Sequence, residues 1–175
     1  MIKLIFLLIV FYVNIYGQSI KDAVDKSIFN CYGKDVNYIS DKIILEKKLK
    51  REIEIKSEQN FFSDEIYFYK IYSNNQIIGY SILDNVYGKS MPITFIVMFD
   101  INGIILCSEI IKYREQYGGA VKNENWLIQF KGKNCESDFK VGKDVNTISG
   151  ATISVNSVTK GIKKLTFLIK ELISK

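Results

Sequence analysis

The 175-residue sequence contains no histidine. This absence excludes Ser-His-Asp and Cys-His nucleophile pairs, histidine zinc sites, and haem attachment through a C-x-x-C-H motif. Proline occurs once, at Pro92, so a proline-rich linker is also excluded. Any chemistry must therefore come from carboxylates, hydroxyls, lysines or thiols, or from a cofactor that brings its own reactivity.

Cysteine is scarce and odd in number, with Cys31, Cys107 and Cys135 and no C-x-x-C motif. Three cysteines cannot all pair within one chain, and their spacing supports neither a zinc site nor a disulfide framework. We therefore expect core or surface thiols, and we expect no metal site.

The composition is that of a globular protein, with 47% apolar and 25% charged residues. The net charge is +5, but the 24 basic and 19 acidic residues interleave, as they do over residues 46–52. A protein that binds nucleic acid more often has a basic stripe with few acids. No nucleic-acid partner is expected.

The first residues have the pattern of a targeting segment. Lys3 is followed by an unbroken apolar run over residues 4–13, and the small residue Gly17 precedes polar Gln18. The run is shorter than the roughly 20 residues that a spanning helix needs. The pattern predicts a signal peptide over residues 1–17, cleaved after Gly17, with a retained N-terminal anchor as the alternative. Either interpretation places the protein outside the cytoplasm, in the periplasm or an equivalent space.

The hydrophobic periodicity of the remaining chain predicts helices at both ends and strands between them. The expected turns are Asn74-Asn75 in the first hairpin and Asn102-Gly103 in the second, where positive φ angles are needed. The expected helices cover about 19–31, 45–56, 123–130 and 155–172, and the expected strands cover 65–72, 76–83, 92–99 and 104–113. This order predicts a single α+β domain, an antiparallel sheet with flanking helices, after the N-terminal segment.

The tetrapeptide Ser149-Gly150-Ala151-Thr152 stands directly before the last predicted helix. The free backbone N–H groups and the positive dipole end of a helix N-terminus favour an anion at this place. The alternative is an ordinary helix cap, with Thr152 or Ser154 as the capping residue. From these residues alone the ordinary cap is favoured, because hydroxyls are common at helix starts.

The wider sequence context favours the anion site. The core Ser-Gly-Ala-Thr followed by x-Ser, within residues 144–154, resembles the flavin-attachment motif of the FMN-binding domain family. That family includes the flavin subunits of the Rnf and sodium-pumping quinone oxidoreductase complexes. Gly88-Lys89, the loop 113–119 and the segment 126–132 agree with the family in order and spacing. The resemblance covers roughly residues 78–165, so residues 78–175 are expected to form the FMN-binding part, with the N-terminal helices and first strand of the same domain in residues 18–77.

The resemblance implies that Thr152 carries FMN covalently, through a phosphoester that a flavin transferase makes from FAD after export. Thr152 would be an anchor for the cofactor, and no catalytic residue is expected. The other residues that would contact the cofactor lie in the motif and in two loops before it. They are Ser149, Gly150, Ala151, Ser154, Lys89, Tyr113, Glu115, Gly118 and Gly119.

The expected function is electron transfer between a membrane-bound redox partner and a downstream acceptor. Two alternatives stay open: a flavin-dependent reductase with its own small-molecule substrate, and a binding or assembly module that has lost the flavin. The second alternative is supported by Asn146, since family members often have aspartate three residues before the serine of the motif. Here Asp144 lies two residues earlier.

Overall fold

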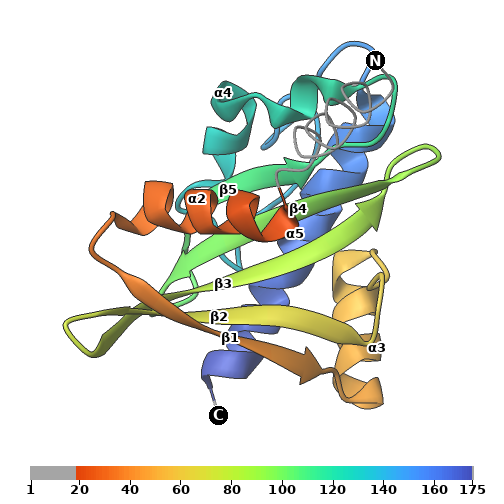
Figure 1. Cartoon of the computed structure of the whole chain (residues 1–175). Helices are drawn as coiled ribbons and strands as arrows, with labels where there is room; N and C mark the ends of the chain where they lie inside the picture. Colours follow the sequence, from red (N-terminus) through yellow and green to blue (C-terminus); the bar gives the residue numbers. More distant parts are fainter. Residues whose placement is uncertain (1–18, 175) are drawn as a thin grey trace, which may run out of the picture.

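The computed structural model describes residues 19–174, so the predicted signal segment 1–17 lies outside the described residues. A five-stranded antiparallel sheet with strand order β1-β2-β3-β4-β5 has helices against both of its faces (Figure 1). This confirms the predicted α+β class with an antiparallel sheet and flanking helices. The described helices are α2 (Ile20–Tyr32), α3 (Lys47–Ser57), α4 (Glu124–Leu127) and α5 (Thr152–Ile173), with 3-10 turns η2 (Gly119–Lys122) and η3 (Ile128–Phe130). The strands are β1 (Asn37–Ile44), β2 (Glu65–Ser73), β3 (Gln76–Tyr87), β4 (Pro92–Asp100) and β5 (Ile105–Lys112).

Strand β4 explains how the sheet carries two apolar layers. Its side chains alternate between the two faces, so Phe95 and Val97 pack with α5 while Ile96 and Met98 pack with α2. Both sets are buried. The nearly continuous apolar run that predicted this strand is therefore a consequence of helices covering both faces.

Strand β1 was not predicted from the sequence. It pairs along its length with β2, from Asn37 opposite Tyr72 to Ile44 opposite Glu65. It is an edge strand, and most of its side chains are exposed. Because it buries little apolar surface, it lacks the alternation by which a strand is found in a sequence.

Both predicted hairpin turns are present, with one difference in their backbone. Asn74 and Asn75 have φ angles of 48° and 61°, as a two-residue hairpin requires. In the second turn Gly103 has a φ of 78°, whereas Asn102 is not among the described residues with positive φ. The glycine alone therefore supplies the left-handed conformation there.

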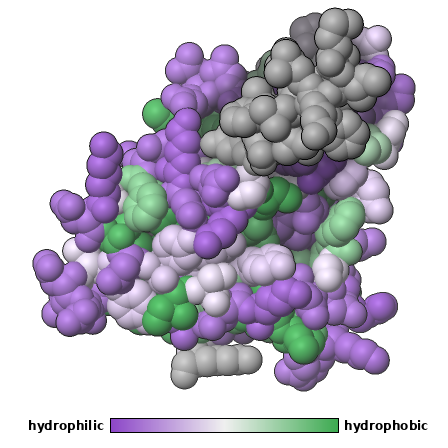
Figure 2. Space-filling view, viewed as in Figure 1, coloured by the Kyte–Doolittle hydropathy of each residue, from purple (hydrophilic) through white to green (hydrophobic). Residues whose placement is uncertain are grey.

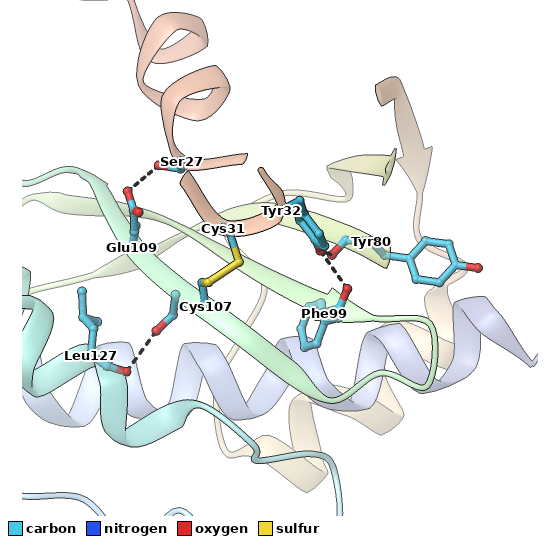
Figure 3. Close-up of a disulfide and its surroundings, with 9 residues drawn as sticks. Ser27, Cys31, Tyr32, Tyr80, Phe99, Cys107, Glu109 and Leu127 are labelled. Carbon is cyan, nitrogen blue, oxygen red and sulfur yellow. Dashed lines mark hydrogen bonds between the residues drawn. A yellow bond between two sulfur atoms is a disulfide. The ribbon is translucent and has the colours of Figure 1, made fainter. Parts of the chain in front are cut away.

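A disulfide corrects the expectation that the cysteines are thiols. Cys31, at the end of α2, is bonded to Cys107 on β5, with a Cα–Cα distance of 6.1 Å (Figure 3). Cys135 has a free thiol. The next residue of α2, Tyr32, adds a second attachment, because its hydroxyl oxygen lies 2.7 Å from the carbonyl oxygens of Tyr80 and Phe99. Burial raises the pKa of this phenol well above its usual range.

Helix α5 crosses the opposite face of the sheet, and one of its lysines is buried in the core. Lys164 is fully buried and lies 2.8 Å from a carboxylate oxygen of Asp84 on β3. Its ammonium group also donates to the carbonyl of Asn60 at 2.9 Å and lies 4.2 Å from the ring centre of Phe61. Burial lowers the pKa of Lys164, and Asp84 opposes that shift. These contacts fix α5 against the sheet and so fix the position of its N-terminus.

Candidate functional site

Helix α5 begins at Thr152 without a side-chain cap. Its N-cap residue is Ala151, and no side chain accepts a hydrogen bond from the first turn. The alternative in which Thr152 or Ser154 caps the helix is therefore wrong. Since the first N–H groups of a helix have no partner within it, and the dipole is positive there, this end favours an anionic ligand.

The residues around this helix start leave it open. Gly150 has a φ of 74°, and a Cβ atom built on it would meet no heavy atom within 4 Å. Thr152 is exposed to solvent, whereas the neighbouring Ala151 and Ser154 are buried. The Thr152 side chain is therefore accessible from solvent.

A cavity of about 890 Å³ lies at this helix start. Three segments distant in sequence form it: the turn before β4, the loop after β5, and the first turn of α5. The lining residues are Lys89, Ser90, Met91, Arg114, Glu115, Gln116, Tyr117, Gly118, Gly150, Ala151, Thr152, Ile153 and Ser154. Of the residues predicted from sequence, Ser149 and Gly119 are not in this lining, and Tyr113 lies behind it.

Tyr113 joins the loop after β5 to helix α5. Its hydroxyl donates to the carbonyl of Tyr117 and lies 2.8 Å from Oγ of Ser154. Because the single phenol proton goes to Tyr117, the Ser154 hydroxyl is the donor of the second bond. Tyr113 and Ser154 thus position the wall of the cavity.

Gly118 has no room for a side chain at this junction. Its φ is 82°, and a Cβ atom would lie 2.8 Å from the Tyr113 hydroxyl oxygen and 2.9 Å from Ser154 Oγ. We expect Gly118→Ala to destabilise the protein by about 2 kcal/mol or more, the strain of a left-handed alanine plus a broken hydrogen bond. Gly142→Ala is the matched control, because Gly142 has a φ of 86° but open space around it. Urea unfolding measures both, and equal losses in the two variants would contradict the steric argument.

Glu115 has a role that its sequence position does not show. Its carboxylate accepts hydrogen bonds from the backbone N–H groups of Ser90 at 2.6 Å and Met91 at 2.9 Å. These bonds hold the turn before β4 against the loop after β5, and so place Lys89 at the cavity. The N–H groups of Met91 and Ser90 lower the pKa of Glu115 below its ordinary value of 4.5.

This pKa shift predicts a titration that NMR can follow. A carboxyl group with a lowered folded-state pKa keeps its contribution to stability above its unfolded pKa and loses it as the pH falls through the folded value. We expect the amide protons of Ser90 and Met91 to shift with a midpoint below pH 4.5. In Glu115→Gln this titration should be absent. A midpoint above pH 4.5 in the parent protein would contradict these hydrogen bonds between Glu115 and the turn before β4.

Trp126 supports the site from the core. It is 7% exposed, its ring meets that of Phe130 edge-on, and its indole N–H donates to the carbonyl of Asn146 at 2.8 Å. The N–H of Asn146 donates to the side chain of Gln129 at 2.8 Å. Because the backbone of Asn146 is held on both sides, the path of the chain into the motif is fixed, while its own side chain is exposed.

The cavity also has an apolar rim that the sequence reasoning missed. Met91, Tyr117 and Ile153 line it and are 44%, 81% and 49% exposed. Met91 and Tyr117 lie in loops, and Ile153 lies on the exposed side of the first turn of α5, so none of the three belongs to the periodic apolar pattern of the core. Exposed apolar side chains around a concave site are typical of a place where a ligand completes their burial.

Comparison with known proteins identifies the ligand class. Residues 88–166 match the model of the FMN-binding domain. This part of the chain is therefore an FMN-binding domain, which confirms the family expected from the Ser-Gly-Ala-Thr motif. The matched segment contains every residue that the sequence predicted as a cofactor contact.

A curated relative agrees with this assignment. The chain is 31% identical over 96 residues to a subunit of the ion-translocating oxidoreductase complex of Buchnera aphidicola subsp. Acyrthosiphon pisum (strain APS). The aligned region is 49% of this chain and 58% of that protein, so the chain spans under two thirds of its relative. The two findings support a flavoprotein with a role in electron transport. Within residues 19–174, no helix has both the length and the apolar character needed to span a bilayer.

Proposed function

We propose that this protein is an electron-transfer flavoprotein that carries FMN covalently on Thr152. The observation that carries the proposal is the exposed Thr152 hydroxyl at the uncapped N-terminus of α5, on a cavity within the FMN-binding segment. The phosphoester bond would join the threonine oxygen to the cofactor phosphate, where the helix dipole and N–H groups stabilise negative charge.

The residues around the cavity fit such a cofactor. Lys89 adds a cation to the lining of the cavity, and Gly150 leaves the backbone open to close approach. Met91, Tyr117 and Ile153 offer apolar contact to the flavin ring. FMN, when bound, supplies the redox chemistry, and the protein holds it and controls its exposure. We further propose that residues 78–175 provide the cofactor-binding part, with residues 18–77 completing the same domain.

Two observations support a location outside the cytoplasm and an association with a membrane-bound complex. The Cys31–Cys107 disulfide is of the kind that persists in oxidising compartments, in agreement with the export predicted from residues 1–17. The relative is named as a component of an ion-translocating oxidoreductase complex. We therefore propose that a membrane-bound redox partner exchanges electrons with the flavin, and that a flavin transferase attaches the cofactor after export.

The test is to express the exported chain with and without a flavin transferase and to examine the denatured protein for flavin fluorescence on a gel. We expect a fluorescent band only with the transferase, and a purified protein whose flavin is reduced by dithionite and reoxidised by a soluble electron acceptor. No fluorescence, with a transferase shown to label its own standard substrate, would contradict the proposal and favour a module without flavin. Sustained turnover of a small molecule without a protein partner would favour a reductase.

A further inference from the structure

A second cavity, of about 640 Å³, lies on the face of the sheet that α2 covers only in part. Seen from this side, the surface around α2 mixes hydrophilic and hydrophobic residues (Figure 2). The volume falls in the range of small-molecule sites. The lining residues are Ile20, Lys21, Val24, Asp25, Tyr38, Ser40, Lys42, Phe62, Ser63, Glu65, Tyr67, Tyr69, Leu83, Asp84, Asn85, Thr94 and Arg114. We call it the tyrosine cavity, and all of its lining except Thr94 and Arg114 precedes the FMN-binding segment.

Four aromatic side chains lie among the mostly polar residues that line the tyrosine cavity. Tyr38 and Tyr69 meet edge-on with ring centres 5.6 Å apart, and Tyr67 and Phe62 are 44% and 42% exposed. Aromatic rings that already pack against one another favour another ring placed among them. The walls therefore suit a planar aromatic ligand.

Arg114 provides a fixed cation in this lining. One terminal nitrogen of its guanidinium donates to the carbonyl of Pro92 at 2.9 Å and to the hydroxyl of Thr94 at 3.0 Å. Thr94 in turn donates to the side chain of Asn85 at 2.6 Å. The remaining guanidinium nitrogens make no hydrogen bond to the described part of the chain, so three N–H donors are left for a ligand.

The carboxylates that line the cavity already have partners. Asp25 accepts from the hydroxyl of Tyr38, Glu65 lies 2.6 Å from Lys42, and Asp84 lies 2.8 Å from Lys164. Arg114 and Lys21, by contrast, form no ion pair with any residue in the range 19–174. Because Tyr38 is neutral, Asp25 keeps its negative charge. The two unpaired cations and this one carboxylate leave a net charge of +1 in the lining, which favours an anion.

We propose that the tyrosine cavity binds a small aromatic carboxylate, with its ring among the tyrosines and its carboxylate on the guanidinium of Arg114. A guanidinium held at one nitrogen presents its other donors in the planar arrangement that a carboxylate matches. This cavity differs from the flavin cavity in all of its lining except Arg114, and the proposal does not rest on the function proposed above.

The probe is 2-naphthoate, added to the purified full chain in mild detergent and followed by isothermal titration calorimetry, with neutral 2-naphthamide as its matched control. We expect naphthoate to bind at least tenfold more tightly than naphthamide. Arg114→Gln should weaken naphthoate binding about tenfold or more and change naphthamide binding little, since a charge-assisted hydrogen bond is lost. Equal binding of both probes, or of naphthoate to parent and Arg114→Gln, would overturn the proposal.

Two further variants separate this cavity from the flavin site, because Arg114 lines both. Tyr67 lines only the tyrosine cavity and Lys89 only the other. Tyr67→Ala should weaken the binding of naphthoate several-fold, and Lys89→Gln should leave it unchanged. Circular dichroism and thermal melting confirm that each variant is folded. The reverse pattern, or no heat of binding to the folded parent chain, would overturn the proposal.

Discussion

Replacing Thr152 with valine is expected to abolish covalent FMN completely while leaving the protein folded. Valine has nearly the shape of threonine but no hydroxyl to form the phosphoester. Thr152 is exposed, and the hydrogen bond that its carbonyl accepts from Asn156 at 2.8 Å does not involve the side chain. Surface substitutions of this kind change stability by about 0.5 kcal/mol at most. Gel fluorescence and intact mass report the cofactor, and thermal melting reports the fold.

The matched control for Thr152→Val is Thr147→Val. Thr147 is also an exposed threonine, and it lies five positions earlier in the same run, but it does not line the cavity. Thr147→Val should therefore keep full fluorescence. Thr152→Ser, which restores a hydroxyl at the same place, should recover labelling. Undiminished fluorescence in Thr152→Val would show that the flavin is attached elsewhere.

Much of the fold could be predicted because its main elements are apolar on a regular period. Strand β4 and helix α5 supply much of the core, so their patterns are strong. The exceptions have a common cause. Strand β1 is exposed, Cys31 and Cys107 are 76 positions apart, and the buried partner of Lys164 lies on another element. Pairings between distant residues leave no mark in the local sequence.

The candidate site likewise has features that local sequence predicts and features that depend on the fold. The start of the last helix could be located to within a few residues, because small residues and hydroxyls before an amphipathic segment indicate a helix N-terminus. The predicted helix begins near residue 155, whereas α5 begins at Thr152. The convergence of Met91 and Tyr117 on that helix depends on how two loops fold across the sheet edge. Glu115, which the sequence predicts as a cofactor contact, lines the cavity, and its carboxylate also accepts hydrogen bonds from two backbone N–H groups of a neighbouring turn. A residue that lines a site can thus also hold a neighbouring segment in place.

Removing the disulfide is expected to destabilise the protein strongly. The double variant Cys31→Ala, Cys107→Ala should lose about 2–5 kcal/mol of unfolding free energy, because a cross-link over 76 positions restricts the unfolded chain. Urea unfolding of the exported protein measures the loss. Cys135→Ala is the control, and it should have a smaller effect, since Cys135 forms no cross-link.

The same variant should loosen α2 more than α5. Helix α2 packs on the sheet through few buried residues, chiefly Val24 and Ile28, while α5 buries a long apolar face. We therefore expect faster hydrogen exchange in α2 with little change in α5, and retention of FMN on Thr152. Thiol counting completes the experiment: the exported parent protein should expose one reactive thiol after unfolding without reductant and three with it. Three thiols in both conditions would contradict the disulfide. The proposed location in an oxidising compartment would then lose the support of this bond.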